Sequence, residues 1–148
     1  MGIFSRIADV FKANVNDTLD KAEDPEKMLK QMVLEMEESV NKATLAVANS
    51  MAHEKSLLRK IEKSKTESAE WMYKAQQAIT VGREDLARAA LEKKAVFDKN
   101  ITDLEPVYTT AKATSEKLQT QLTALKSKLD EARARQGTLI ARSQAAKA

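Results

Sequence analysis

The chain has 148 residues and a net charge of +3, from 25 Lys and Arg against 22 Asp and Glu. Its three Gly, two Pro, one Trp, two Tyr and three Phe are too few for the turns and thick core of an α/β or all-β domain. With no Cys and one His, disulfides, zinc–thiolate sites and multi-histidine metal sites are excluded. We therefore expect an all-α protein of the reducing cytoplasm.

Residues 1–24 are predicted to form an amphipathic helix and a junction. Apolar side chains occupy one half of the helical wheel and polar ones the other, which is typical of a helix lying in a membrane interface. The alternative is a helix packed on the protein's own core. Because a thin two-helix hairpin offers little core to cover this face, we favour membrane insertion. The residues predicted to bind membrane are Ile3, Phe4, Ile7, Val10, Phe11 and Val15.

A long helix is predicted to begin where Asp24 supplies an N-cap and Pro25 occupies the first helical position. Neither Gly nor Pro then occurs until Gly82. We expect Gly82 and Arg83 to form the tip of a hairpin near residues 80–85, after which the helical pattern resumes. Pro106 falls at a solvent-facing position, where it should kink the second helix without ending it.

Apolar residues repeat with alternating spacings of four and three in both predicted helices, which is typical of a coiled coil. Residues 25–148 are therefore predicted to form a long antiparallel two-helix coiled-coil hairpin. The first seam comprises Leu29, Val33, Met36, Val40, Ala43, Val47, Ser50, Glu54, Leu57, Ile61, Ser64, Ser68, Trp71, Ala75 and Ala78. The second comprises Phe97, Ile101, Leu104, Tyr108, Ala111, Ser115, Leu118, Leu122, Leu125, Leu129, Ala132, Gln136 and Leu139.

The two seams also predict a register. When the chain is folded back at its central Gly, facing residue numbers sum to about 165, and each a position meets a d position. Glu37 then lies near Lys126 and Arg133, and Lys65 lies near Glu105. The signs of these flanking charges agree with the proposed pairing.

Signals for catalysis are almost absent. The sequence contains no phosphate-binding loop, dinucleotide fingerprint, zinc-protease motif or nucleophile elbow, so we predict no enzyme, cofactor or metal site. The C-terminal quarter is basic and could touch phosphates, but no aromatic residues interleave with its cations, and we expect no nucleic-acid binding. These cations are Lys126, Lys128, Arg133, Arg135, Arg142 and Lys147.

Trp71 is the single Trp and lies on the first seam, opposite Lys94. Packing in the core is the default interpretation. The alternative is that Trp71 anchors a protein partner.

Three stretches of the chain resemble the phage shock protein A family, a bacterial branch of the ESCRT-III superfamily that includes the vesicle-inducing protein in plastids. They are Met1–Arg6, Lys21–Lys27 and Gly82–Leu91. The order of amphipathic helix, junction and long hairpin also matches, so the resemblance covers the whole chain.

The resemblance implies a peripheral protein on the cytoplasmic face of the bacterial inner membrane. Such a protein binds anionic or packing-defective lipid and maintains or remodels the membrane under stress. Homo-oligomers are expected when further C-terminal helices are present. The alternative function is a regulatory coiled coil that binds and inhibits the ATPase domain of a bacterial enhancer-binding transcription activator. Nucleotide hydrolysis in some relatives uses a Glu where Lys126 stands here, so we do not carry that activity over.

Overall fold

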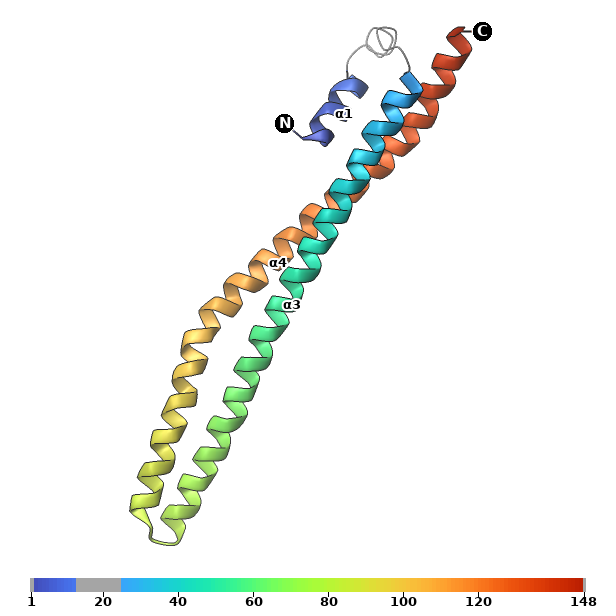
Figure 1. The fold of residues 1–148 in the computed structure, drawn as a ribbon. Coiled ribbons are helices and arrows are strands. Elements are labelled where there is room, and N and C mark those ends of the chain that lie inside the picture. Colours follow the sequence, from blue (N-terminus) through green and yellow to red (C-terminus); the bar gives the residue numbers. More distant parts are fainter. Residues whose placement is uncertain (1, 13–24, 148) are drawn as a thin grey trace. The chain divides into compact units, whose positions relative to one another are not determined.

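The computed structural model describes residues 2–12 and 25–147 (Figure 1). These ranges contain helix α1 (Ile3–Lys12), helix α3 (Pro25–Thr80) and helix α4 (Glu84–Lys147), and they contain no strand. The long helices α3 and α4 pack against each other, which confirms the prediction of an all-α hairpin preceded by a short helix. Val15 and Asp24 lie outside the described residues.

The turn between α3 and α4 is a Schellman motif centred on Gly82. Gly82 has a φ of 75°, a left-handed conformation that glycine adopts without steric cost. Its amide donates to the Ile79 carbonyl at 3.0 Å, and the Arg83 amide donates to the Ala78 carbonyl at 2.8 Å. The Arg83 carbonyl accepts a hydrogen bond from the Ala87 amide at 3.1 Å, so α4 starts directly after the turn.

The chain divides into two compact units, and each contains a part of both long helices. The terminal unit comprises Met1–Val47 and Leu118–Ala148, and the turn unit comprises Ala48–Lys117. The predicted boundary at residue 24 lies in a stretch that is not described and stays a prediction.

Large aliphatic side chains fill the core of the terminal unit. Met36 is 0% exposed and Leu129 is 4% exposed. Burying one such side chain stabilises the fold by about 1.5–3 kcal/mol. The buried seam residues here are Leu29, Val33, Met36, Val40 and Val47 on α3, and Leu122, Leu129, Ala132 and Leu139 on α4. The two predicted seams therefore account for nine buried residues of this unit.

The core of the turn unit is narrower and more polar. Its buried residues are Leu57, Ile61, Ser64, Ser68, Ala75, Ala78, Ala87, Ala90, Ala111 and Ser115. The Ser68 hydroxyl donates to Oδ1 of Asp98 at 2.5 Å, and the Lys94 ammonium donates to Oδ2 at 2.6 Å. The hydrogen bond from Lys94, followed by that from Ser68, lowers the pKa of Asp98. This cluster spans both helices and ties them together beside the seam.

Ion pairs between the long helices match the predicted register. In the terminal unit, Arg133 Nη2 lies 2.9 Å from Glu37 Oε1. In the turn unit, Lys65 Nζ lies 3.9 Å from Glu105 Oε1. Exposed pairs contribute only about 0.2–1 kcal/mol each, so they align the helices more than they stabilise them. Helix α4 continues through Pro106, whose side chain is exposed.

Candidate membrane-binding site

Helix α1 packs its apolar face against the other helices of the terminal unit. Ile7 is 3% exposed and Val10 is 9% exposed. Because α1 has only 10 residues and cannot bury side chains by itself, this burial comes from contact with other helices. The remaining apolar positions, Ile3, Phe4 and Phe11, are half-buried. The five predicted membrane-inserting residues that α1 contains therefore lie on the face turned toward the protein.

Two contacts tie α1 to both long helices. Arg6 Nη1 lies 3.5 Å from Glu35 Oε2 on α3. On α4, the Arg135 guanidinium lies 5.2 Å from the centroid of the Phe11 ring, within the range of a cation–π interaction. Arg135 is itself held by Glu131, whose carboxylate lies 3.1 Å away. Helix α1 is thus a third helix laid across the α3–α4 pair.

Met32 is buried at the edge of the seam in the terminal unit. It flanks the seam, between Leu29 and Val33, at a position that a two-stranded coiled coil leaves partly exposed, yet it is only 5% exposed. We expected the thin hairpin to offer little core for α1, and the structure differs, since Ile7 and Val10 of α1 are buried. An apolar residue at a flanking position is a sequence signal for additional buried surface, and the seam analysis did not use it.

Partly open clefts lie between α1 and α4. One of about 270 Å³ is lined by Phe4, Ile7, Phe11 and the side chains of Lys128 and Arg135, among others. A second of about 230 Å³ lies beside Phe11. Because both clefts are open on one side, α4 covers the apolar face of α1 incompletely, which agrees with the half-buried rings of Phe4 and Phe11.

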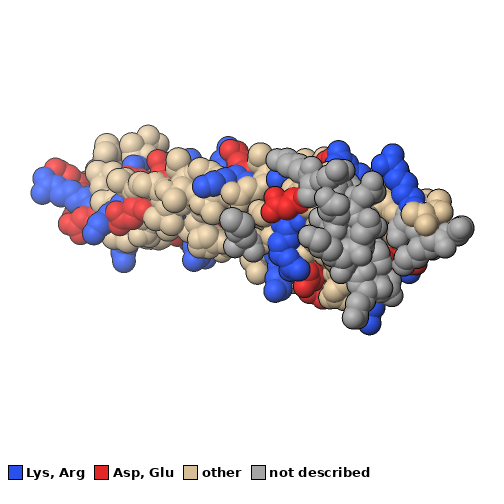
Figure 2. Space-filling view, turned by 90° about the horizontal axis from the view of Figure 1, so that it is seen from above, with Lys and Arg blue, Asp and Glu red and all other residues tan. Residues whose placement is uncertain are grey.

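Charges of both signs occur on the face of the molecule drawn in Figure 2. Among the described side chains of this face, Lys and Arg are interspersed with Asp and Glu. This face therefore presents no broad patch of positive charge.

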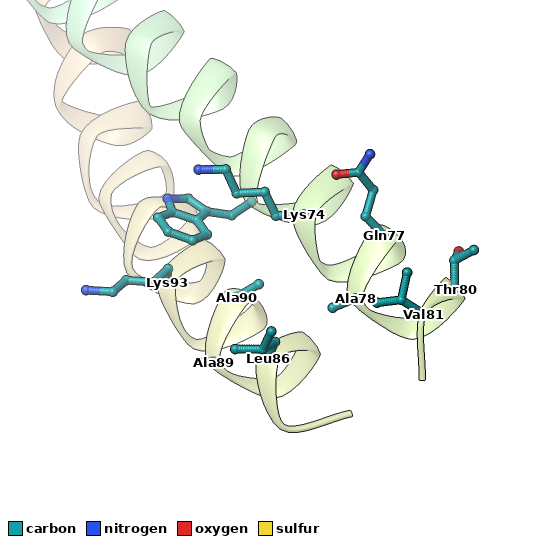
Figure 3. Close-up of a pocket in the computed structure, with 10 residues that line it drawn as sticks. Lys74, Gln77, Ala78, Thr80, Val81, Leu86, Ala89, Ala90 and Lys93 are labelled. Atoms are coloured by element: carbon teal, nitrogen blue, oxygen red, sulfur yellow. The ribbon is translucent and has the colours of Figure 1, made fainter. Parts of the chain in front are cut away.

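A second candidate site is a groove of about 750 Å³ next to the turn (Figure 3). Its floor is apolar, formed by Ala78, Val81, Leu86, Ala89 and Ala90. Half-buried Trp71 lines it, and Lys74 Nζ lies 4.3 Å from the centroid of a Trp71 ring. Lys93 lines the opposite side, from α4 (Figure 3). Seam periodicity put Trp71 opposite Lys94, whereas the lysines that line the groove are Lys74 and Lys93. Lys94 itself is hydrogen-bonded to Asp98.

Within residues 2–12 and 25–147, no group of three or more His, Cys, Asp or Glu side chains is arranged to hold a metal ion. In the same ranges, no helix combines the length and the apolar character needed to cross a bilayer.

A short amphipathic helix docked on a long antiparallel hairpin defines a class of helical-hairpin proteins. The family model of the PspA/IM30 family matches residues 2–148, so the chain belongs to that family, as its sequence resemblance predicted.

Named relatives agree with the family assignment. The chain is 41% identical to "Membrane-associated protein Vipp1" of Synechocystis sp., over 100% of this chain and 55% of that protein. It is 36% identical to "Phage shock protein A homolog" of Deinococcus radiodurans, over 100% of this chain and 66% of that protein. "Protein LiaH" of Bacillus subtilis is 32% identical over 99% of this chain and 65% of its own length. The chain therefore spans about half the length of the Vipp1 relatives it matches.

Proposed function

We propose that the chain is the membrane-binding part of a peripheral stress-response protein that maintains or remodels the bacterial inner membrane from its cytoplasmic face. Ile3, Phe4, Ile7, Val10 and Phe11 would insert into the bilayer interface, together with Val15. The observation that carries the proposal is the one-sided apolar face of α1, in a family whose relatives include proteins named membrane-associated.

The free energy of insertion follows from burial. Transferring an apolar side chain of this size out of water contributes about 1.5–3 kcal/mol. Because Ile7 and Val10 are already buried against the protein, their insertion replaces one apolar environment with another. The net gain in free energy on insertion comes from half-buried Phe4 and Phe11, whose rings gain full burial between lipid chains.

Liposome flotation tests the proposal. The Phe4→Glu variant should no longer float with small vesicles, because it places a charge at the centre of the inserted face. Ser5→Glu is the matched control, since it adds the same charge at the neighbouring, exposed position and should float like the wild type. Circular dichroism should show an intact hairpin in both variants.

Salt provides a second arm of the same experiment. Residues 1–19 carry two basic and two acidic side chains, so raising the salt concentration should weaken binding only modestly. Flotation of Phe4→Glu at the wild-type level, or loss of wild-type binding on addition of salt, would reject insertion. The basic residues of the last quarter would then be the lipid contact.

A second candidate function rests on the groove beside the turn. A half-buried Trp with two lysines around an apolar floor is suited to hold a protein segment, and aromatic anchors of this kind dominate interface energies. The partner implied by the family resemblance is the ATPase domain of a transcription activator. Pull-down of such a domain by the chain, lost in Trp71→Ala, would support it. The family resemblance implies homo-oligomers when further C-terminal helices are present, and we propose them on that condition.

A further inference from the structure

We infer that the α3–α4 pair of the terminal unit competes with lipid for the apolar face of α1, so that the docked helix is an autoinhibited form of the membrane-binding site. The inference rests on the proposed function and adds its regulation. The two partners are mutually exclusive, because Ile7 and Val10 cannot contact the long helices and a bilayer at the same time.

The contacts that hold α1 are suited to reversible docking. Arg6–Glu35 and Arg135–Phe11 link α1 to one long helix each, and the side chains involved are partly or fully exposed. We call these two contacts the latch. Exposed ion pairs and cation–π contacts are weak individually. The open clefts beside Phe11 and Phe4 leave part of the apolar face of α1 uncovered.

Only molecules in which α1 is free can bind lipid through it. The apparent affinity for lipid is therefore the intrinsic affinity multiplied by the fraction of such molecules. Any change that breaks the latch without touching the apolar face should therefore increase lipid binding. This sign is opposite to that expected if Arg6 or Arg135 served mainly to attract lipid phosphates.

Paired substitutions separate the effect of breaking a latch contact from the effect of changing the net charge. Glu35→Ala breaks the pair with Arg6, whereas Glu38→Ala removes the same charge from an exposed position further along α3. Arg135→Ala breaks the contact with Phe11, whereas Lys126→Ala removes an equal charge from an exposed position of α4. With small vesicles of zwitterionic phosphatidylcholine, each latch variant should bind about two- to fivefold more tightly than its control.

A reversible cross-link provides the complementary test. The chain has no Cys, so the double variant Arg6→Cys, Glu35→Cys carries only the two thiols placed at the latch. Joining them with a short, reducible bis-maleimide should abolish flotation, and reductive cleavage of the linker should restore it. Each single-Cys variant, treated with the same reagent, should keep floating.

The outcomes separate the inference from the proposed function. If the wild type floats, Phe4→Glu does not, and latch breaking and cross-linking change nothing, then α1 binds lipid and autoinhibition is wrong. If neither the wild type nor any latch variant floats, membrane insertion itself is rejected. If Arg135→Ala binds less tightly than Lys126→Ala, the Arg135 side chain is a lipid contact and the latch is overturned.

Discussion

The terminal unit and the turn unit place their large apolar residues differently. In the terminal unit most of them lie inside, where Leu29 and Met36 are almost fully buried, and Leu34 and Leu45 are exposed exceptions. In the turn unit, small residues and serines fill much of the seam, while large side chains lie on the surface. The exposed ones there are Met72, Tyr73, Ile79, Val81, Leu86, Leu91, Val96 and Val107.

This difference shows that one coiled-coil pattern supports two kinds of surface. Apolar area that is buried within a unit stabilises it, whereas apolar area left on the outside is available to a partner. The terminal unit covers part of its apolar surface with α1. The turn unit leaves an apolar groove open beside Trp71.

The largest expected effect is in the core of the terminal unit. Leu129→Ala should lower the free energy of unfolding by about 2–5 kcal/mol, because it leaves a cavity among closely packed aliphatic side chains. Leu91→Ala, the same change on the same helix but in the turn unit, should cost much less, since Leu91 is 43% exposed. Denaturant titration measures both. If both substitutions lowered the free energy of unfolding equally, the two units would not differ in how they bury large apolar residues.

A disulfide sharpens the register of the terminal unit. A Cys pair at Val40 and Leu125 should form an intramolecular bond and stabilise the chain by about 2–4 kcal/mol, because the predicted register places these two seam positions opposite each other. A pair at Val40 and Leu118 lies a heptad out of register and should not oxidise. Equal cross-linking of both pairs would indicate a slipping seam or pairing between chains.

Trp71→Ala tests the turn unit. The ring is only half-buried, so its removal should cost less than the about 3–5 kcal/mol typical of a fully buried Trp. Binding of an activator ATPase domain should fall at the same time. If thermal unfolding shows the full loss of stability, Trp71 belongs to the core and the groove has no anchor.

The smallest effect concerns Asp98. Lys94 and Ser68 lower its pKa below the ordinary value of an aspartate carboxyl. Its contribution to stability is therefore fully present above that ordinary pKa and is lost as the pH falls through the lowered value. In Asp98→Asn, this part of the pH dependence of the melting temperature should disappear. Asp103→Asn, an exposed position further along α4, is the control. A wild-type profile in Asp98→Asn would show that the cluster adds no stability.

The hairpin could be predicted from the sequence because each part of it depends on local pattern. Heptad spacing identified the buried seams, and Gly82 identified the turn, since few other residues adopt a positive φ. The pairing of Glu37 with Arg133 followed from the register. The docking of α1 could not be predicted in the same way. It depends on groups from both long helices, such as Glu35 on α3 and Arg135 on α4, which come together only after the hairpin has formed.

The Schellman turn also has a consequence for the order in which the chain folds. Ser68 and Asp98 are 30 residues apart in sequence, whereas Glu37 and Arg133 are 96 apart. Closing a loop costs more entropy as it lengthens, so contacts near the turn form first and the hairpin zips towards the chain ends. Substitutions near Gly82 should therefore slow folding, and those around Leu129 should mainly accelerate unfolding. The surface of α3 and α4 on which α1 docks is then among the last to form during folding and among the first to be lost during unfolding.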